Sequence, residues 1–83
     1  MNTLDYLITA QGVVERGLFY NYIHSLGYKD DTYTREDMIN STYPFAICIK
    51  KKKVFILESA TQCFFMHKNG KIKTVDEIKE ILV

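Results

Sequence analysis

The spacing of apolar residues changes several times along the chain, and each change marks a predicted element. Apolar and other residues alternate from Leu4 to Ile8, which is the period of a β-strand. Beyond residue 13 the apolar positions recur every four residues, as in an amphipathic helix. This stripe consists of Val14, Leu18, Tyr22 and Leu26, widened by Phe19 and Ile23. We therefore predict a strand over Leu4–Ile8 and then a long helix that ends at a glycine cap, Gly27.

The opposite face of this helix is predicted to be polar and exposed to solvent. It carries Glu15, Arg16, Tyr20, Asn21 and His24. Gly17 also lies within the helix, where a glycine costs about 1 kcal/mol relative to alanine. Either another segment approaches the backbone closely at this glycine, or the glycine is simply tolerated.

Residues 28–42 lack a sustained period and predict a long connection. Within it, Thr34 can cap a short helical turn, because acidic residues follow closely and favour a helix N-terminus. That turn would extend to Met38 and Ile39. Pro44 then stops any helix and opens a strand.

Two β-rich runs, Phe45–Lys50 and Lys53–Glu58, flank Lys51 and Lys52 and predict a hairpin with a two-residue turn. The register would pair Ile49 with Val54, Ile47 with Ile56, Cys48 with Phe55 and Ala46 with Leu57. Both faces of this hairpin would be apolar, although a small antiparallel sheet usually has one face exposed to solvent. We therefore expect the hairpin to be covered on both faces, by the chain's own helices or by a partner.

The last quarter of the chain predicts a second hairpin. Cys63–His67 has the composition of a strand, and Asn69-Gly70 tolerates the positive φ angles of a type I′ turn. Lys71–Lys73 would be the short return strand.

A terminal helix is expected after this hairpin, because Thr74 and Glu77 have the spacing of a capping box. Its apolar stripe is Val75, Ile78, Ile81 and Leu82. The predicted order is therefore β-α-β-β-β-β-α, in one α+β domain that spans residues 1–83. Its antiparallel sheet has four to five strands, packed against one long helix and the short C-terminal helix.

Composition narrows the function classes without selecting one. The chain is 47% hydrophobic and 25% charged, which is typical of a folded globular protein and not of a disordered one. Its formal net charge is only +1, so it lacks the basic excess of a general nucleic-acid binder. The sequence shows neither a secretion leader nor a membrane span, and Cys48 and Cys63 are expected to be free thiols. We expect a cytoplasmic protein.

The candidates for catalytic and metal chemistry are weak. Cys63 and His67 would lie about 13 Å apart along the predicted strand, too far to share one zinc ion. The acids of the long connection, Asp30, Asp31, Glu36 and Asp37, do not match the spacing of a calcium loop. The four glycines are scattered and form no phosphate-binding loop. We expect no enzyme activity, no metal and no cofactor.

Lysines gather at the tips of the two predicted hairpins. They are Lys50, Lys51, Lys52 and Lys53 at the first tip and Lys68, Lys71 and Lys73 at the second. Such tips can contact phosphates, or they can be solvated turns that keep sheet edges apart. An RNA- or DNA-binding module is therefore the alternative function.

The aromatic residues give the leading function. The chain has six Tyr and five Phe together with a doubly apolar hairpin. Either its core is simply rich in aromatic residues, or part of this apolar surface is exposed, and large exposed apolar patches mark interaction surfaces. We predict a non-enzymatic binding protein that occupies a surface of a host or other partner protein and inhibits or modulates it. It would act as a monomer or as a homodimer formed through the hairpin or an edge strand. The predicted anchors are Tyr20, Tyr33, Phe55 and Phe64, with Lys51 and Lys52 steering the approach.

Three segments also carry a resemblance to a known group. GLFYNYIHSLGYK, then YPFAICI with VFIL, and finally ATQCFFMHKNGKIKTVDEIKEIL resemble the small α/β accessory proteins of T4-like tailed phages. The likeness lies in the pattern of elements over most of the chain. It implies a protein that binds and inhibits a host or host-defence protein, without implying the target or any site residue.

Overall fold

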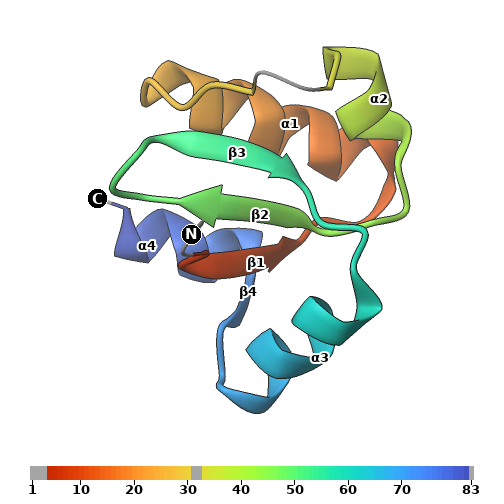
Figure 1. Cartoon of the computed structure of the whole chain (residues 1–83). Helices are drawn as coiled ribbons and strands as arrows, with labels where there is room; N and C mark the ends of the chain where they lie inside the picture. The colour runs from red at the N-terminus through yellow and green to blue at the C-terminus, as the bar shows by residue number, and fades with distance from the viewer. Residues whose placement is uncertain (1–3, 31–32, 83) are drawn as a thin grey trace.

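The computed structural model describes residues 4–30 and 33–82. Its elements are β1 (Tyr6–Thr9), α1 (Gly12–Ser25), α2 (Arg35–Asn40), β2 (Phe45–Cys48), β3 (Lys53–Ile56), α3 (Ala60–Lys68), β4 (Ile72–Thr74) and α4 (Val75–Ile81) (Figure 1). The strands form one sheet in the order β3-β2-β1-β4. β2 is antiparallel to β1 and to β3, whereas β4 is parallel to β1. The predicted α+β class is therefore confirmed, but the sheet is mixed and not wholly antiparallel.

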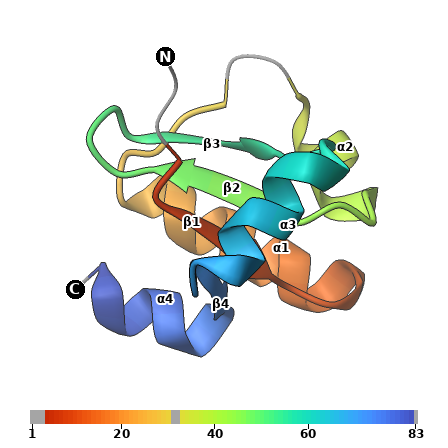
Figure 2. The ribbon, with the colours of Figure 1, turned by 60° about the horizontal axis from the view of Figure 1, so that its bottom comes forward.

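Helices cover both faces of this sheet. α1 and α2 lie on one face, α3 lies on the other, and α4 runs beside β4 at the edge of the α1 side (Figures 1 and 2). The predicted strand Leu4–Ile8 is present as Tyr6–Thr9, and the predicted long helix is present as Gly12–Ser25. The short turn after Thr34 is present as α2, since the Thr34 hydroxyl accepts a hydrogen bond from the N–H of Asp37 at 3.1 Å.

The β2–β3 hairpin is present in a different register. Phe45 lies opposite Ile56 and Ile47 lies opposite Val54, which moves the predicted pairing by two residues. The turn is longer than expected, and only Lys52 takes a positive φ, at 52°. A two-residue type I′ turn would need two such residues, which a pair of lysines does not favour. Because side chains alternate with a period of two, the shift leaves every residue on its predicted face.

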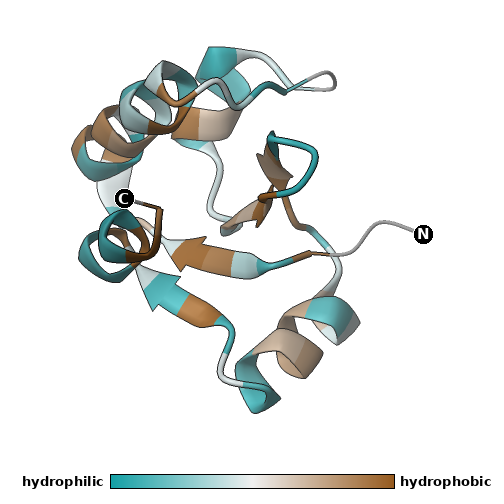
Figure 3. Cartoon of the chain, turned by 90° about the vertical axis from the view of Figure 1, so that its left-hand side faces the viewer, coloured by the Kyte–Doolittle hydropathy of each residue, from teal (hydrophilic) through white to brown (hydrophobic). Residues whose placement is uncertain are grey.

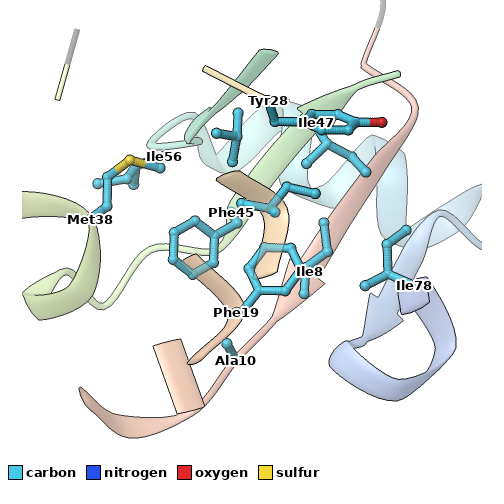
Figure 4. Packing of buried hydrophobic residues seen from close by; sticks show 11 residues of the cluster. Ile8, Ala10, Phe19, Tyr28, Met38, Phe45, Ile47, Ile56 and Ile78 are labelled. Atoms are coloured by element: carbon cyan, nitrogen blue, oxygen red, sulfur yellow. The ribbon is translucent and has the colours of Figure 1, made fainter. Parts of the chain in front are cut away.

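The main core fills the space between α1 and the sheet. The rings of Phe19 from α1 and Phe45 from β2 meet at a centroid distance of 5.2 Å, and both side chains are fully buried. α2 contributes Met38 and α4 contributes Ile78 to the same cluster. The cluster also contains Ile8, Ala10, Ile23, Tyr28, Ile47, Val54 and Ile56 (Figure 4). This side of the sheet is therefore closed by three helices.

The face that α1 turns to this core differs from the predicted one. Val14 and Leu18 were expected in the core, yet their side chains are 76% and 64% exposed. Residues spaced by four drift around a helix by about 40° at each step, so Val14 and Leu26 cannot both face the sheet. Phe19 and Ile23 pack in the core, and Val14 and Leu18 are exposed to solvent.

Arg16 was predicted to be exposed, and it is buried, with only 3% of its surface accessible. Its Nη1 donates to the Tyr43 carbonyl at 2.8 Å, while its Nε and Nη2 donate to the Met38 carbonyl. The Ile39 carbonyl accepts a further bond from Nε at 3.2 Å. Two of these carbonyls belong to the last turn of α2, where a helix lacks internal donors and favours a positive charge. Burial lowers the pKa of the guanidinium, and the hydrogen bonds explain how the charge is tolerated.

The predicted strand Cys63–His67 is wrong, because these residues belong to helix α3. The Ser59 hydroxyl starts the helix by accepting a hydrogen bond from the N–H of Gln62 at 3.3 Å. The helix ends at Gly70, whose φ is +68°. The N–H groups of Gly70 and Lys71 donate to the carbonyls of His67 and Met66, which is the Schellman pattern. The Asn-Gly pair therefore supplies its positive φ to a helix end and not to a hairpin.

α3 forms a second, smaller core with the opposite face of the sheet. Leu7, Ala46, Leu57 and Met66 are buried in it, and Phe55, Cys63, Ile72 and Leu4 are partly buried around them. Both faces of the β2–β3 hairpin are thus covered by helices of the same chain. Of the two predicted alternatives, cover by the chain's own helices is therefore the one observed, and the exposed apolar surface lies on helices instead of on the hairpin.

The two C-terminal elements are present, but the strand begins one residue later than predicted and pairs with a different strand. β4 covers Ile72–Thr74 but pairs in parallel with β1, because no antiparallel strand precedes it. The Thr74–Glu77 capping box is confirmed, with the Thr74 N–H donating to Glu77 at 3.0 Å and the Glu77 N–H donating to the Thr74 hydroxyl at 3.2 Å.

Candidate functional site

Two adjacent phenylalanines on α3 form the main candidate site. The side chains of Phe64 and Phe65 are 67% and 62% exposed. Met66, the next residue, points the other way and is only 7% exposed in the second core. Figure 3 shows light-brown, hydrophobic stretches in α3 between teal, hydrophilic ones. We call the surface of Thr61, Phe64, Phe65 and Lys68 the α3 outer face, since the spacing i, i+3, i+4, i+7 puts these residues on one side of a helix.

Local structure explains why these rings are outside. α3 is a short helix of 9 residues, about two and a half turns, and Met66 is its buried residue. Met66 anchors the helix on the sheet, and Cys63 lies beside it on the same side, half-buried. With the sheet side of the helix occupied by residues 63 and 66, the rings at 64 and 65 must face solvent.

The charged side chains of α3 and the segment that follows it have one sign. Residues 59–73 contain three of the eleven basic side chains, and all ten acidic side chains lie outside this stretch. His67 and Lys68 fall in the last turn of α3, and exposed Lys71 follows the helix. Lys73 points to the other face of the sheet, where its Nζ lies 6.0 Å from the Tyr6 ring centroid. The aromatic pair is therefore bordered by positive charge at the C-terminal end of α3.

Only one of the six predicted partner-binding residues, Phe64, lies on the α3 outer face. Phe55 is half-buried in the second core beneath α3. Lys51 and Lys52 are exposed at the β2–β3 turn, where Lys52 Nζ donates to the Leu26 carbonyl at 3.1 Å. The structure thus separates the predicted steering lysines from the predicted anchor.

The two predicted tyrosines lie on the other side of the sheet and are half-buried. The Tyr20 ring stacks on His24 at a centroid distance of 4.1 Å, with the Arg35 guanidinium 5.7 Å away. Tyr33 donates its N–H to the Asp30 carboxylate. Partial burial and the nearby carboxylate of Glu58 raise the pKa of the Tyr33 hydroxyl. Both rings pack against the main core and offer little free surface.

The helical form of α3 also changes the geometry of its cysteine and histidine. Cys63 and His67 are four residues apart on a helix, where side chains are about 5–6 Å apart and not 13 Å. Among the residues that the structure describes, no group of three His, Cys, Asp or Glu side chains is placed to hold a metal ion. Cys48 and Cys63 are free thiols, as predicted, the first buried and the second half-buried.

A second apolar surface lies on α1, next to a groove between α1 and α4. The groove has a volume of about 450 Å³, and Leu18 and Val75 form its apolar wall. Glu15, Asp76 and Lys79 lie at its rim. Neither this surface nor the α3 outer face belongs to a helix that could cross a membrane: none of the helices in the described ranges has the required length and apolar character.

Comparison of the chain with protein-family models, with characterised proteins and with solved structures found no match. The function must therefore be argued from the exposed surfaces of the chain itself.

Proposed function

We propose that this chain is a small non-enzymatic binding protein that docks on a partner protein through the α3 outer face. The observation that carries the proposal is the exposure of Phe64 and Phe65 side by side on one helix. An amphipathic helix that presents such anchors is a recurring means of filling an apolar groove in another protein. The resemblance to phage accessory proteins adds the proposal that the partner is a host protein and that binding inhibits or modulates it.

The energetics favour these rings as anchors. Burying one large apolar side chain contributes about 1.5–3 kcal/mol, so two adjacent rings can supply much of the affinity of a modest complex. α3 is already folded and held on the sheet by Met66. Little ordering cost is therefore left to oppose binding.

The same geometry weakens the nucleic-acid alternative. That alternative relied on two lysine-tipped hairpins, and the second is replaced by the end of α3. At the remaining tip, Lys52 is hydrogen-bonded to Leu26. A convex helix with two rings pointing outward fits a protein groove better than a continuous strand of bases, which is usually bound along a charged groove.

The proposal is tested by comparative affinity capture from cells that produce the chain, with and without nuclease treatment. The wild-type chain is compared with the double variant Phe64→Ser/Phe65→Ser. We expect a protein that is retained by the wild type in both arms and lost with the double variant. The matched control is Tyr43→Ser, because Tyr43 is an exposed aromatic residue that is not part of α3, 47% accessible.

Three results would contradict the proposal. The captured proteins could be the same for the wild type and the α3 double variant, or Tyr43→Ser could abolish capture as well. A partner retained only without nuclease would instead favour the RNA- or DNA-binding alternative.

A further inference from the structure

The outer side of α1 carries an apolar surface that the fold leaves uncovered. Val14 and Leu18 lie one turn apart on the helix and are 76% and 64% exposed. The side chain of Tyr22, one turn further, is half-buried. Residues spaced by four form the ridges by which helices pack against each other. This line of residues therefore has the form of a helix-packing ridge without a partner.

The charges along this ridge are separated by sign. Glu15 and Asp76 line the groove near the N-terminal ends of α1 and α4. Lys79 lies at the other end of the groove, with its Nζ 5.2 Å from the Tyr22 ring centroid. The ridge is thus negative beside Val14, apolar at Leu18 and positive beside Tyr22.

We propose that a second copy of this chain occupies the ridge, in an antiparallel arrangement of the two α1 helices about a twofold axis close to Leu18. The axis brings the two Leu18 side chains together and places Val14 of each copy against Tyr22 of the other. It also places Glu15 of each copy near Lys79 of the other, so that both ends of the contact join opposite charges. A surface with this alternation is complementary to itself, which is what a twofold interface requires.

The length of α1 suits a helix-to-helix contact. α1 has 14 residues and is about 21 Å long, and α4 lies beside it to widen the contact. An interface of about 800 Å² on each partner is typical of a specific complex. The β3 edge of the sheet is less suited to this role. On the outer edge of β3, Lys29 already accepts a hydrogen bond from the Val54 N–H at 3.0 Å and donates one to Lys52 at 2.9 Å.

This inference is independent of the proposed function, because α1 and α3 lie on opposite faces of the sheet (Figure 2). A dimer formed through α1 keeps both α3 outer faces free. Two copies joined in this way would present two binding helices and gain avidity for a partner with repeated sites.

Sedimentation velocity over a range of protein concentrations tests the inference. We expect the wild-type chain to sediment as a species of twice the chain mass, and Leu18→Glu to sediment as one chain. The matched control is Phe64→Glu, which adds the same charge at an equally exposed ring on α3 and should leave the dimer intact. The variants Glu15→Lys and Lys79→Glu should each lose the dimer alone and recover a heterodimer when mixed, because mixing restores opposite charges at both ends.

Several outcomes would overturn the inference. They are a wild-type chain that stays monomeric at its highest attainable concentration, a Leu18→Glu variant that still dimerises, and a Phe64→Glu variant that does not. A mixture of the two charge variants that stays monomeric would exclude the antiparallel arrangement. If the wild type is monomeric and Leu18→Glu loses a captured foreign protein, the ridge serves a different partner and the inference also fails.

Discussion

The guanidinium carbon of Arg16 lies 4.2 Å from the centroid of the Phe45 ring, at the junction of α1, α2 and β2. A buried cation over an aromatic face gains electrostatic energy from the ring. The same group closes the end of α2 through the carbonyls of Met38 and Ile39. One side chain on α1 therefore fixes α2 against the main core.

Replacing this arginine should destabilise the chain. Arg16→Met keeps the apolar stem but leaves buried carbonyls without their donors, and we expect a loss of about 3 kcal/mol in the free energy of unfolding. Urea unfolding measures this change. The control Arg35→Met removes an exposed guanidinium 5.7 Å from the Tyr20 ring and should cost less than about 1 kcal/mol. If Arg16→Met costs no more free energy of unfolding than Arg35→Met, the buried hydrogen bonds of Arg16 do not stabilise the fold.

Two glycine substitutions should have opposite signs. An alanine Cβ at Gly17 would meet only Ile39 Cδ1, at an ordinary 3.8 Å, so no segment requires a glycine there. Gly17→Ala should stabilise the chain by about 0.5–1 kcal/mol. Gly70 ends α3 at φ +68°, and Gly70→Ala should destabilise it by about 1–2 kcal/mol through backbone strain alone. Thermal unfolding of both variants distinguishes these effects, and changes of the same sign would contradict them.

Neighbouring residues of α3 should differ sharply in their effect on stability. Phe64→Ala removes a ring that is 67% exposed and should change the free energy of unfolding by no more than about 0.5 kcal/mol. Met66→Ala removes a buried side chain from the small second core and should cost about 2–5 kcal/mol. Denaturant unfolding provides the measurement. A large loss with Phe64→Ala would mean that the ring is part of the core and is not available for docking.

The capping box of α4 should contribute to stability in a pH-dependent way. Hydrogen bonds from the Thr74 backbone and side chain lower the pKa of the Glu77 carboxyl. A carboxylate whose pKa is lower in the folded state stabilises the fold above its unfolded pKa, and this contribution is lost as the pH falls through its folded pKa. Glu77→Gln should therefore flatten the acid side of the stability profile. Glu80→Gln, which removes a carboxylate from an exposed position of the same helix outside the capping box, is the control, and an equal change with both variants would contradict the role of the capping box.

Local signals in the sequence identified several elements with their correct type. The caps at Thr34 and Thr74 and the breaks at Gly27 and Pro44 depend on short-range backbone chemistry, which a sequence displays directly. The faces of the central hairpin were also predictable, because a register shift of two residues leaves each side chain on the same face of the sheet. Its turn length was not, since it depends on whether Lys52 accepts a positive φ.

Two predictions were wrong, the strand at Cys63–His67 and the exposure of Arg16, and tertiary structure explains both. Cys63–His67 contains residues that suit a buried strand or a helix equally well over so short a run, and Asn69-Gly70 serves either as a hairpin turn or as a helix end. Ser59, a good N-cap followed by a run of helix-compatible residues, was the signal that could have indicated α3. The burial of Arg16 could not be predicted, because the carbonyls that it binds come from a segment more than twenty residues away.

The candidate site was predicted only through Phe64. Its neighbour Phe65 is similarly exposed, and residue type alone does not distinguish it from core aromatics unless the segment is known to be helical. Tyr20, Tyr33 and Phe55 are chemically similar rings that the fold half-buries. Exposure is decided by which element covers which face, and this information is absent from residue type alone.

The most direct test of the central claim, that the α3 outer face docks on another protein, is photo-crosslinking from position 64 in living cells. A photoreactive phenylalanine analogue replaces Phe64 in one sample and, as the control, Tyr43 in another, since both rings are exposed. We expect a specific crosslinked protein from position 64 that is absent from the position 43 sample. Crosslinks only to solvent, to nucleic acid, or equally from both positions would contradict it.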